Sequence, residues 1–258
     1  MYARCWRLIR QATLTESGGG AIIPEMEDKL DKDSIGRELA ECIAQARELR
    51  ARRETDPDAA DYPFLKQWQA DRLARTYADL LASERYAPAA EFFLSDLYGP
   101  KDFRSRDDEL TRVVPVMVRV LPARALFTLL EAVKMDTLSE SLDTDMVKAL
   151  RVAGRSHDVD WDAYVAAYRS VGRHGDREQQ IALVLKIGQT LDRLTRMPLI
   201  RVSLRIMEGP AHLAGLAALH SFLQRGFDAF SEMKGADEFL AIVTARETAM
   251  MNEWFNPG

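Results

Sequence analysis

The spacing of apolar residues constrains the fold of this chain more than any other feature of its sequence. From Ser34 onward, apolar side chains recur every three or four residues, the period of a helix that is buried on one face. One valine-rich run, residues 110–121, could be interpreted as a buried strand, but the sequence offers no second strand to pair with it. We therefore predict an all-α chain with no sheet.

The sequence predicts eight to ten helices, packed as one compact domain over residues 34–258. The segments with a helical pattern are 34–53, 64–81, a short helix from Pro88, 110–121 with a bend near Pro115, 122–153, 161–171, 176–197, 212–233 and 236–255. Glycine and proline mark the boundaries: Gly154 is expected to end the longest helix, and Gly209-Pro210 to separate two later ones. A length of 258 residues without an evident linker favours a single domain.

The first 33 residues differ from the rest of the chain. They show no sustained apolar stripe, and they contain a Gly-rich joint at residues 18–20. The arginine-rich start could suit an organellar transit peptide, but a disordered extension explains it more simply. We expect residues 1–33 to be such an extension, with Met26 as the natural start of the protein.

Composition limits the classes of function. Forty acidic residues against 35 basic ones give a net charge of −5, which argues against a general affinity for nucleic acid. Two cysteines and four scattered histidines cannot build a disulfide framework or a thiolate metal site, so we expect no cofactor and a reducing, cytoplasmic environment. No run approaches the roughly 20 apolar residues that cross a membrane. A homodimer is left open.

The stretch FFLSDLYGPKDFRSRDDEL, residues 92–110, is the most unusual in the chain. In a structural interpretation, Gly99 ends a short helix in the left-handed conformation, Pro100 prevents its continuation, and the aromatic rings pack at the corner. In a functional interpretation, the charged groups beside these rings form a pocket for an anion. The residues that would line this pocket are Asp96, Tyr98, Asp102, Arg104, Arg106, Asp107 and Arg112.

The same stretch resembles a family of uncharacterised bacterial all-helical proteins that share the pattern F-F-x-x-D-L-Y-G-x-x-D-F-x-x-R-D. In this chain the pattern begins at Phe92 and ends at Asp107. The resemblance runs from roughly residue 35 to the C-terminus. It implies a bacterial source and supports Met26 as the start, but it implies no activity.

Catalytic motifs are missing from the sequence. It contains no phosphate-binding glycine loop, no nucleophile elbow and no glutamate three residues before a histidine, as di-iron bundles require. The leading hypothesis is therefore a binding or regulatory protein whose partner is a protein or a small anion. One alternative is an enzyme that acts on an anionic substrate near residues 96–112, or through scattered carboxylates such as Asp136. Another is a haem protein that uses His212 or His220, which we predict to lie on one helix.

Overall fold

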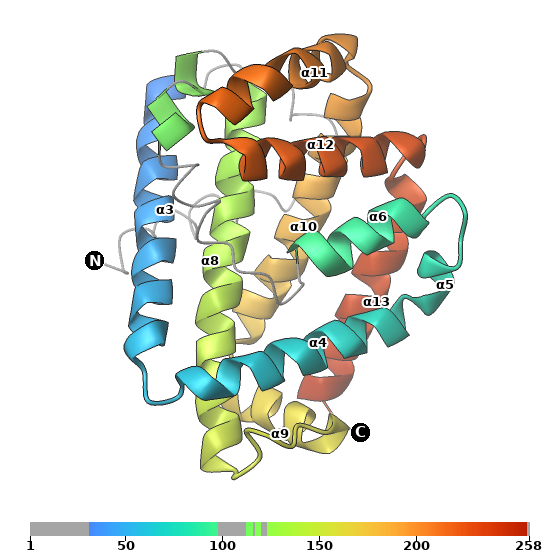
Figure 1. Ribbon diagram of the computed structural model, residues 1–258. Helices are drawn as coiled ribbons and strands as arrows, with labels where there is room; N and C mark the ends of the chain where they lie inside the picture. The colour runs from blue at the N-terminus through green and yellow to red at the C-terminus, as the bar shows by residue number, and fades with distance from the viewer. Residues whose placement is uncertain (1–30, 98–111, 116, 120–122, 257–258) are drawn as a thin grey trace.

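The computed structural model describes residues 31–97, 112–115, 117–119 and 123–256 (Figure 1). These residues form helices joined by turns, and none of them belongs to a β-strand. The predicted all-α class is confirmed. Residues 1–30, including Met26, lie outside the described residues, so the N-terminal extension stays a prediction.

The described residues form ten α-helices. In chain order they are α3 (Lys32–Thr55), α4 (Tyr62–Thr76), α5 (Ala78–Leu81), α6 (Ala87–Phe92), α8 (Ala123–Val152), α9 (Trp161–Val171), α10 (His174–Thr195), α11 (Pro198–Leu213), α12 (Ala217–Glu232) and α13 (Asp237–Phe255). A short 3-10 helix, Ala59–Asp61, precedes α4, and a π-helical turn, Phe93–Leu97, follows α6. Residues 112–115 and 117–119 are also helical, as the pattern over 110–121 predicts.

Figure 1 shows α8 running down the molecule between α3 and α10, with α13 on the other side of α10. Helices α4, α6 and α12 cross in front of these long helices, and α9 closes the lower end. Helix α8 is 30 residues long and contributes to each of the three hydrophobic clusters that the described residues form. Its upper part packs on α3 through Leu126 and Leu130, its middle supplies Met135, and its lower part packs on α9 through Met146 and Leu150.

Several predicted boundaries are confirmed by the backbone. Helix α9 spans the predicted residues 161–171, because Asp160 caps its start by accepting a hydrogen bond from the Ala163 amide at 2.8 Å. Gly154 follows α8 with a φ of 68°, the left-handed conformation expected of a terminating glycine.

Other boundaries differ from the sequence-based expectation. Helix α3 begins before Ser34, because Asp31 caps it by accepting a hydrogen bond from the Asp33 amide at 3.2 Å. Helix α10 begins at His174, two residues before the predicted 176, and Asp176 lies in its first turn, where it pairs with Arg173 at 2.5 Å. The predicted helix 64–81 is divided at Tyr77 into α4 and α5.

The expected break at Gly209-Pro210 is wrong. Pro210 lies within the last turns of α11, where it leaves the carbonyl of Ile206 without its helical partner. Ile206 and Pro210 are both exposed, so water can bind the carbonyl of Ile206. The chain turns instead at Gly215, whose φ is 69°, and this turn places His212 on α11 and His220 on α12.

Helices α10 and α13 approach each other closely at Gly188. A Cβ atom on Gly188 would overlap Leu240 Cδ2 and lie 3.1 Å from Leu240 Cδ1. Leu240 is 2% exposed and has little room to move, so glycine is needed for this contact.

A surface ion pair joins α13 to α5. Arg246 binds Asp79 through two parallel hydrogen bonds of 2.7 Å. The side-chain hydrogen bonds from Arg246 lower the pKa of Asp79 to about 2 from its ordinary value of 3.8.

Candidate functional site

A cavity of about 170 Å³ lies between the helices in the middle of the molecule. Helices α3, α4, α8, α10, α12 and α13 contribute most of its wall. This cavity is lined by both charged and aliphatic side chains, so it differs from the three hydrophobic clusters.

The charged residues reach the cavity because of their spacing along the helices. On α8, Asp136, Glu140 and Asp143 follow one another at intervals of four and three residues, which places them on one face. The same rule brings Lys66, Gln69 and Arg72 together on α4, and Arg177 and Gln180 on α10. Each set continues a stripe that otherwise carries apolar residues.

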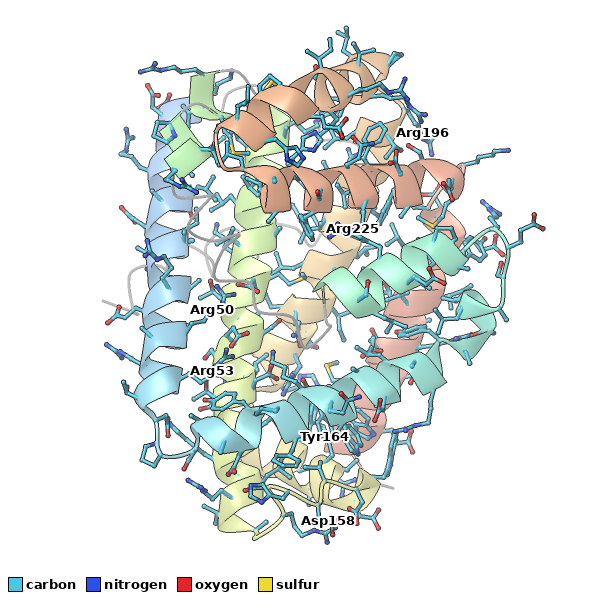
Figure 2. The ribbon with its side chains drawn as sticks, in the orientation of Figure 1. Arg50, Arg53, Asp158, Tyr164, Arg196 and Arg225 are labelled. Atoms are coloured by element: carbon cyan, nitrogen blue, oxygen red, sulfur yellow. The ribbon has the colours of Figure 1, made fainter. Side chains whose placement is uncertain are left out.

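The carboxylates of α8 are paired with cations from two other helices. Lys66 Nζ lies 2.5 Å from Asp143 Oδ2, and Gln69 donates a hydrogen bond of 2.8 Å to Asp143 Oδ1. From α3, Arg53 binds Glu140 at 2.8 Å and Arg50 binds Asp136; Figure 2 shows both arginines directed toward α8.

The pairing keeps these buried groups ionised. Burial alone would raise the pKa of Asp143, but Lys66, Gln69 and Arg177 together lower it below its ordinary value. Burial likewise opposes the charge of Lys66, yet Asp143 and Glu140 outweigh it and raise the Lys66 pKa.

Arg72 has its own carboxylate partner on α13. Its Nη1 lies 2.6 Å from Glu247 Oε1, which also accepts a hydrogen bond of 2.6 Å from the Tyr77 hydroxyl. The guanidinium carbon of Arg72 lies 5.8 Å from the centre of the Trp254 ring. Arg72 is 8% exposed, and its charge is compensated within the protein.

Arg177 is the exception. It is 6% exposed, yet no carboxylate of the described residues lies within 4.0 Å of its nitrogen atoms. Its Nη1 donates a long hydrogen bond of 3.3 Å to Gln180 Oε1, and its Nη2 is buried without a partner in the described part of the chain.

A tyrosine ring is the other close neighbour of Arg177. The guanidinium carbon lies 4.5 Å from the centre of the Tyr168 ring. Burial raises the pKa of Tyr168 well above its ordinary value, so its hydroxyl is neutral and adds no negative charge. The ring face attracts the cation but carries no net charge. Asp143 is close enough for its pKa to be lowered by Arg177, but it forms its ion pair with Lys66.

The charges around the cavity therefore do not balance among the described residues. Each of the four lining carboxylates has a cation: Arg50 for Asp136, Arg53 and Lys66 for Glu140, Lys66 for Asp143, and Arg72 for Glu247. Arg177 remains as the cation in excess. An uncompensated charge in a protein interior costs several kcal/mol, so the site is electrostatically suited to an anion.

Most of the site predicted from the sequence lies outside the described residues. The Asp96 side chain and the residues Tyr98, Asp102, Arg104, Arg106 and Asp107 lie outside the described part of the structure, as does Gly99. Arg112 is described: it is exposed, it donates a hydrogen bond of 3.2 Å to the Gly215 carbonyl, and it does not line the cavity. The anion pocket near residues 96–112 stays a prediction.

Two of the predicted corner rings are described, and both belong to hydrophobic packing. Phe92 is buried, with its ring centre 5.4 Å from that of Phe222. The Phe93 ring meets Phe239 edge-on at 6.4 Å. These contacts join Phe92 to α12 and Phe93 to α13, and the corner at Gly99 stays a prediction.

The two histidines considered for haem have different environments. His220 is 9% exposed, and its Nε2 donates a hydrogen bond of 2.8 Å to the Leu204 carbonyl, assuming the tautomer that this contact requires. His212 is exposed on the neighbouring helix. Among the described residues, no group of three or more histidine, cysteine, aspartate and glutamate side chains forms a metal site.

The cavity residues were missed by the sequence analysis except for Asp136. The available signal was the spacing of Asp136, Glu140 and Asp143 on a helix that is otherwise apolar on that face. Within the described ranges, no helix combines the length and the apolar content needed to span a bilayer.

The chain was compared with models of protein families. Residues 48–257 match a family described as a domain of unknown function, DUF8198. The matched range includes the stretch 92–110 and starts somewhat later than the predicted residue 35. The bacterial source and the shared pattern within that stretch stay predictions. Comparisons with curated proteins and with solved structures found no match.

Proposed function

The chain belongs to the DUF8198 family, and we propose that its function is to bind a small anionic ligand in the cavity beside Arg177. The observation that carries the proposal is the buried guanidinium of Arg177, which lines the cavity and has no carboxylate partner among the described residues. A bound anion would supply that partner. Because this charge is enclosed between helices, a small molecule suits the site better than a protein surface does.

The neighbouring groups support binding of an anion over binding of a cation. Lys66 and Arg72 occupy the carboxylates nearest to them, so a second cation would have to displace an existing ion pair. An anion requires no such exchange. Gln180 lies beside Arg177 and donates to the Ser139 hydroxyl at 2.7 Å, so small polar groups that can orient a ligand are already in place.

The test is a titration of the full chain with acetate and with inorganic phosphate at constant ionic strength, followed by amide NMR. We expect saturable shifts for residues around the cavity, and at least tenfold weaker binding by Arg177→Met. The matched control is Arg193→Met, which removes the same charge from an exposed position on the same helix. Equal binding by both variants, or no saturable binding by the parent, would contradict the proposal.

A further inference from the structure

We infer that the ligand of this cavity is a compact monocarboxylate with an apolar body, similar in size to hexanoate or benzoate. This inference rests on the proposed function and adds the chemical class of the ligand. It depends on how charged and aliphatic residues are distributed along the cavity, on the cavity volume and on the number of excess charges.

Charged and aliphatic residues lie at opposite ends of the cavity. On α10, Arg177 and Gln180 come first and Val184 follows; on α8, Val133 comes first and Asp143 lies ten positions later. Figure 1 shows that α10 runs upward and α8 downward, so both helices place their charged residues at the lower end. Helix α13 runs in the direction of α8 and agrees, with Val243 above Glu247.

The upper end is a surface that water does not solvate well. Val133, Val184 and Val243 are all at least nine-tenths buried, and Leu129 and Leu223 also line the cavity. An apolar cavity of about 150 Å³ in another protein stays dry and binds benzene. The volume here is about 170 Å³, so a ligand that carries only charge would leave the aliphatic wall without contacts.

The dimensions set the length of the ligand. Arg177 and Val184 are seven residues apart on one helix, which corresponds to about 10 Å along the helix axis. An extended six-carbon acid, or an aromatic acid of similar size, spans this distance with its carboxylate near Arg177. A longer chain would exceed this distance.

The number of charges favours a monoanion. Arg177 is a single excess cation among the described residues, and Asp143, Glu140 and Glu247 line the same end of the cavity. A dianion such as a phosphate ester would bring its second charge close to these carboxylates, whose repulsion disfavours it. A carboxylate carries one charge in the planar geometry that a guanidinium binds best.

The experiment is a titration of the full chain with acetate, butyrate, hexanoate, decanoate, benzoate and inorganic phosphate at constant ionic strength. We expect affinity to rise by about fourfold per added methylene from acetate to hexanoate, and to fall again for decanoate. Benzoate should bind about as tightly as hexanoate, and phosphate should bind more weakly than either.

Two variants separate the apolar end from the charged end. Ala132→Leu adds a side chain on the α8 wall of the cavity, so hexanoate affinity should fall at least tenfold while acetate affinity stays unchanged. Val184→Leu adds a smaller obstruction and serves if the first variant does not fold. The control is Ala51→Leu, which makes the same addition at an exposed position of α3.

The possible results distinguish the two proposals. If acetate binds through Arg177 but hexanoate binds no more tightly, the ligand class is wrong and the proposed function stands. If none of the anions binds, or if hexanoate binding does not depend on Arg177, both are overturned. Tight hexanoate binding that Ala132→Leu weakens and Arg177→Met abolishes supports both.

Discussion

Replacing Arg177 by methionine should make the ligand-free protein more stable, which is unusual for a buried residue with native contacts. Methionine has a similar length and can fill the same space without a charge. The variant removes the buried cation that has no carboxylate partner among the described residues. The matched comparison is Arg72→Met, which removes a buried cation that does have such a partner, Glu247.

The expected magnitude follows from the contacts of each arginine. Arg177 loses a 3.3 Å hydrogen bond to Gln180 and the attraction of the Tyr168 ring, each contributing about 1 kcal/mol. Removing an uncompensated buried charge returns several kcal/mol. We therefore expect Arg177→Met to raise the free energy of unfolding by about 1–2 kcal/mol.

Arg72→Met should have the opposite sign. It leaves Glu247 without its cation, and an unpaired buried charge of this kind costs about 3–5 kcal/mol. Because the Glu247 side chain is 23% exposed and partly screened by water, we expect a loss of about 2–4 kcal/mol.

Urea unfolding followed by circular dichroism, at neutral pH and without added carboxylates, measures both changes. The slope of the transition should be the same for the parent and both variants, so that the midpoints report stability alone. If Arg177→Met is destabilised to a similar extent as Arg72→Met, Arg177 is a structural counterion, for example of Asp143, and the reasoning about an excess charge is wrong.

Three further predictions concern the fold. Gly188→Ala should lower the free energy of unfolding by about 1–3 kcal/mol through overlap with Leu240. In a double-mutant cycle, the variant that carries both Gly188→Ala and Leu240→Ala should lose less stability than the two single variants lose in sum. His220→Ala should cost about 1–3 kcal/mol because it leaves a buried carbonyl unpaired, whereas His212→Ala should stay within about 0.5 kcal/mol of the parent; equal urea midpoints would contradict the assigned contact. The side-chain carboxyl of Asp79 should titrate by carbon NMR with a midpoint at about 2 in place of 3.8. Because folding lowers this pKa, the stability that the pair with Arg246 contributes is complete at pH values above 3.8 and is lost as the pH falls to about 2. A midpoint at the ordinary pKa would show that the pair is not formed in solution.

The helices could be predicted from the sequence because their signals are local. Apolar periodicity located α8, α9 and α13, and the conformations of Gly154 and Asp160 follow from capping preferences that act within a few residues. Pro210 misled the prediction because proline weakens a helix without always ending it. Its cost is small where the freed carbonyl can reach water.

The cavity could not be predicted in the same way because its contacts join distant parts of the chain. Arg72 and Glu247 are separated by 175 positions, and Gln69 and Asp143 by 74. The spacing on α8 shows that three carboxylates share a face, but it does not show which cations they meet. The excess charge of Arg177 depends on how all the other charged residues of the cavity are paired, and these pairs join helices that are distant in the sequence.

The position of α8 also has a consequence for how the molecule comes apart. Because this one helix supplies Leu126 and Leu130 to one hydrophobic cluster, Met135 to another and Met146 to the third, no cluster can lose it and remain intact. Local opening of α11, whose surface is largely exposed, leaves these clusters in place. Separation of α8 removes a wall from all three, so heat or denaturant should disrupt the central helices together, in one cooperative transition.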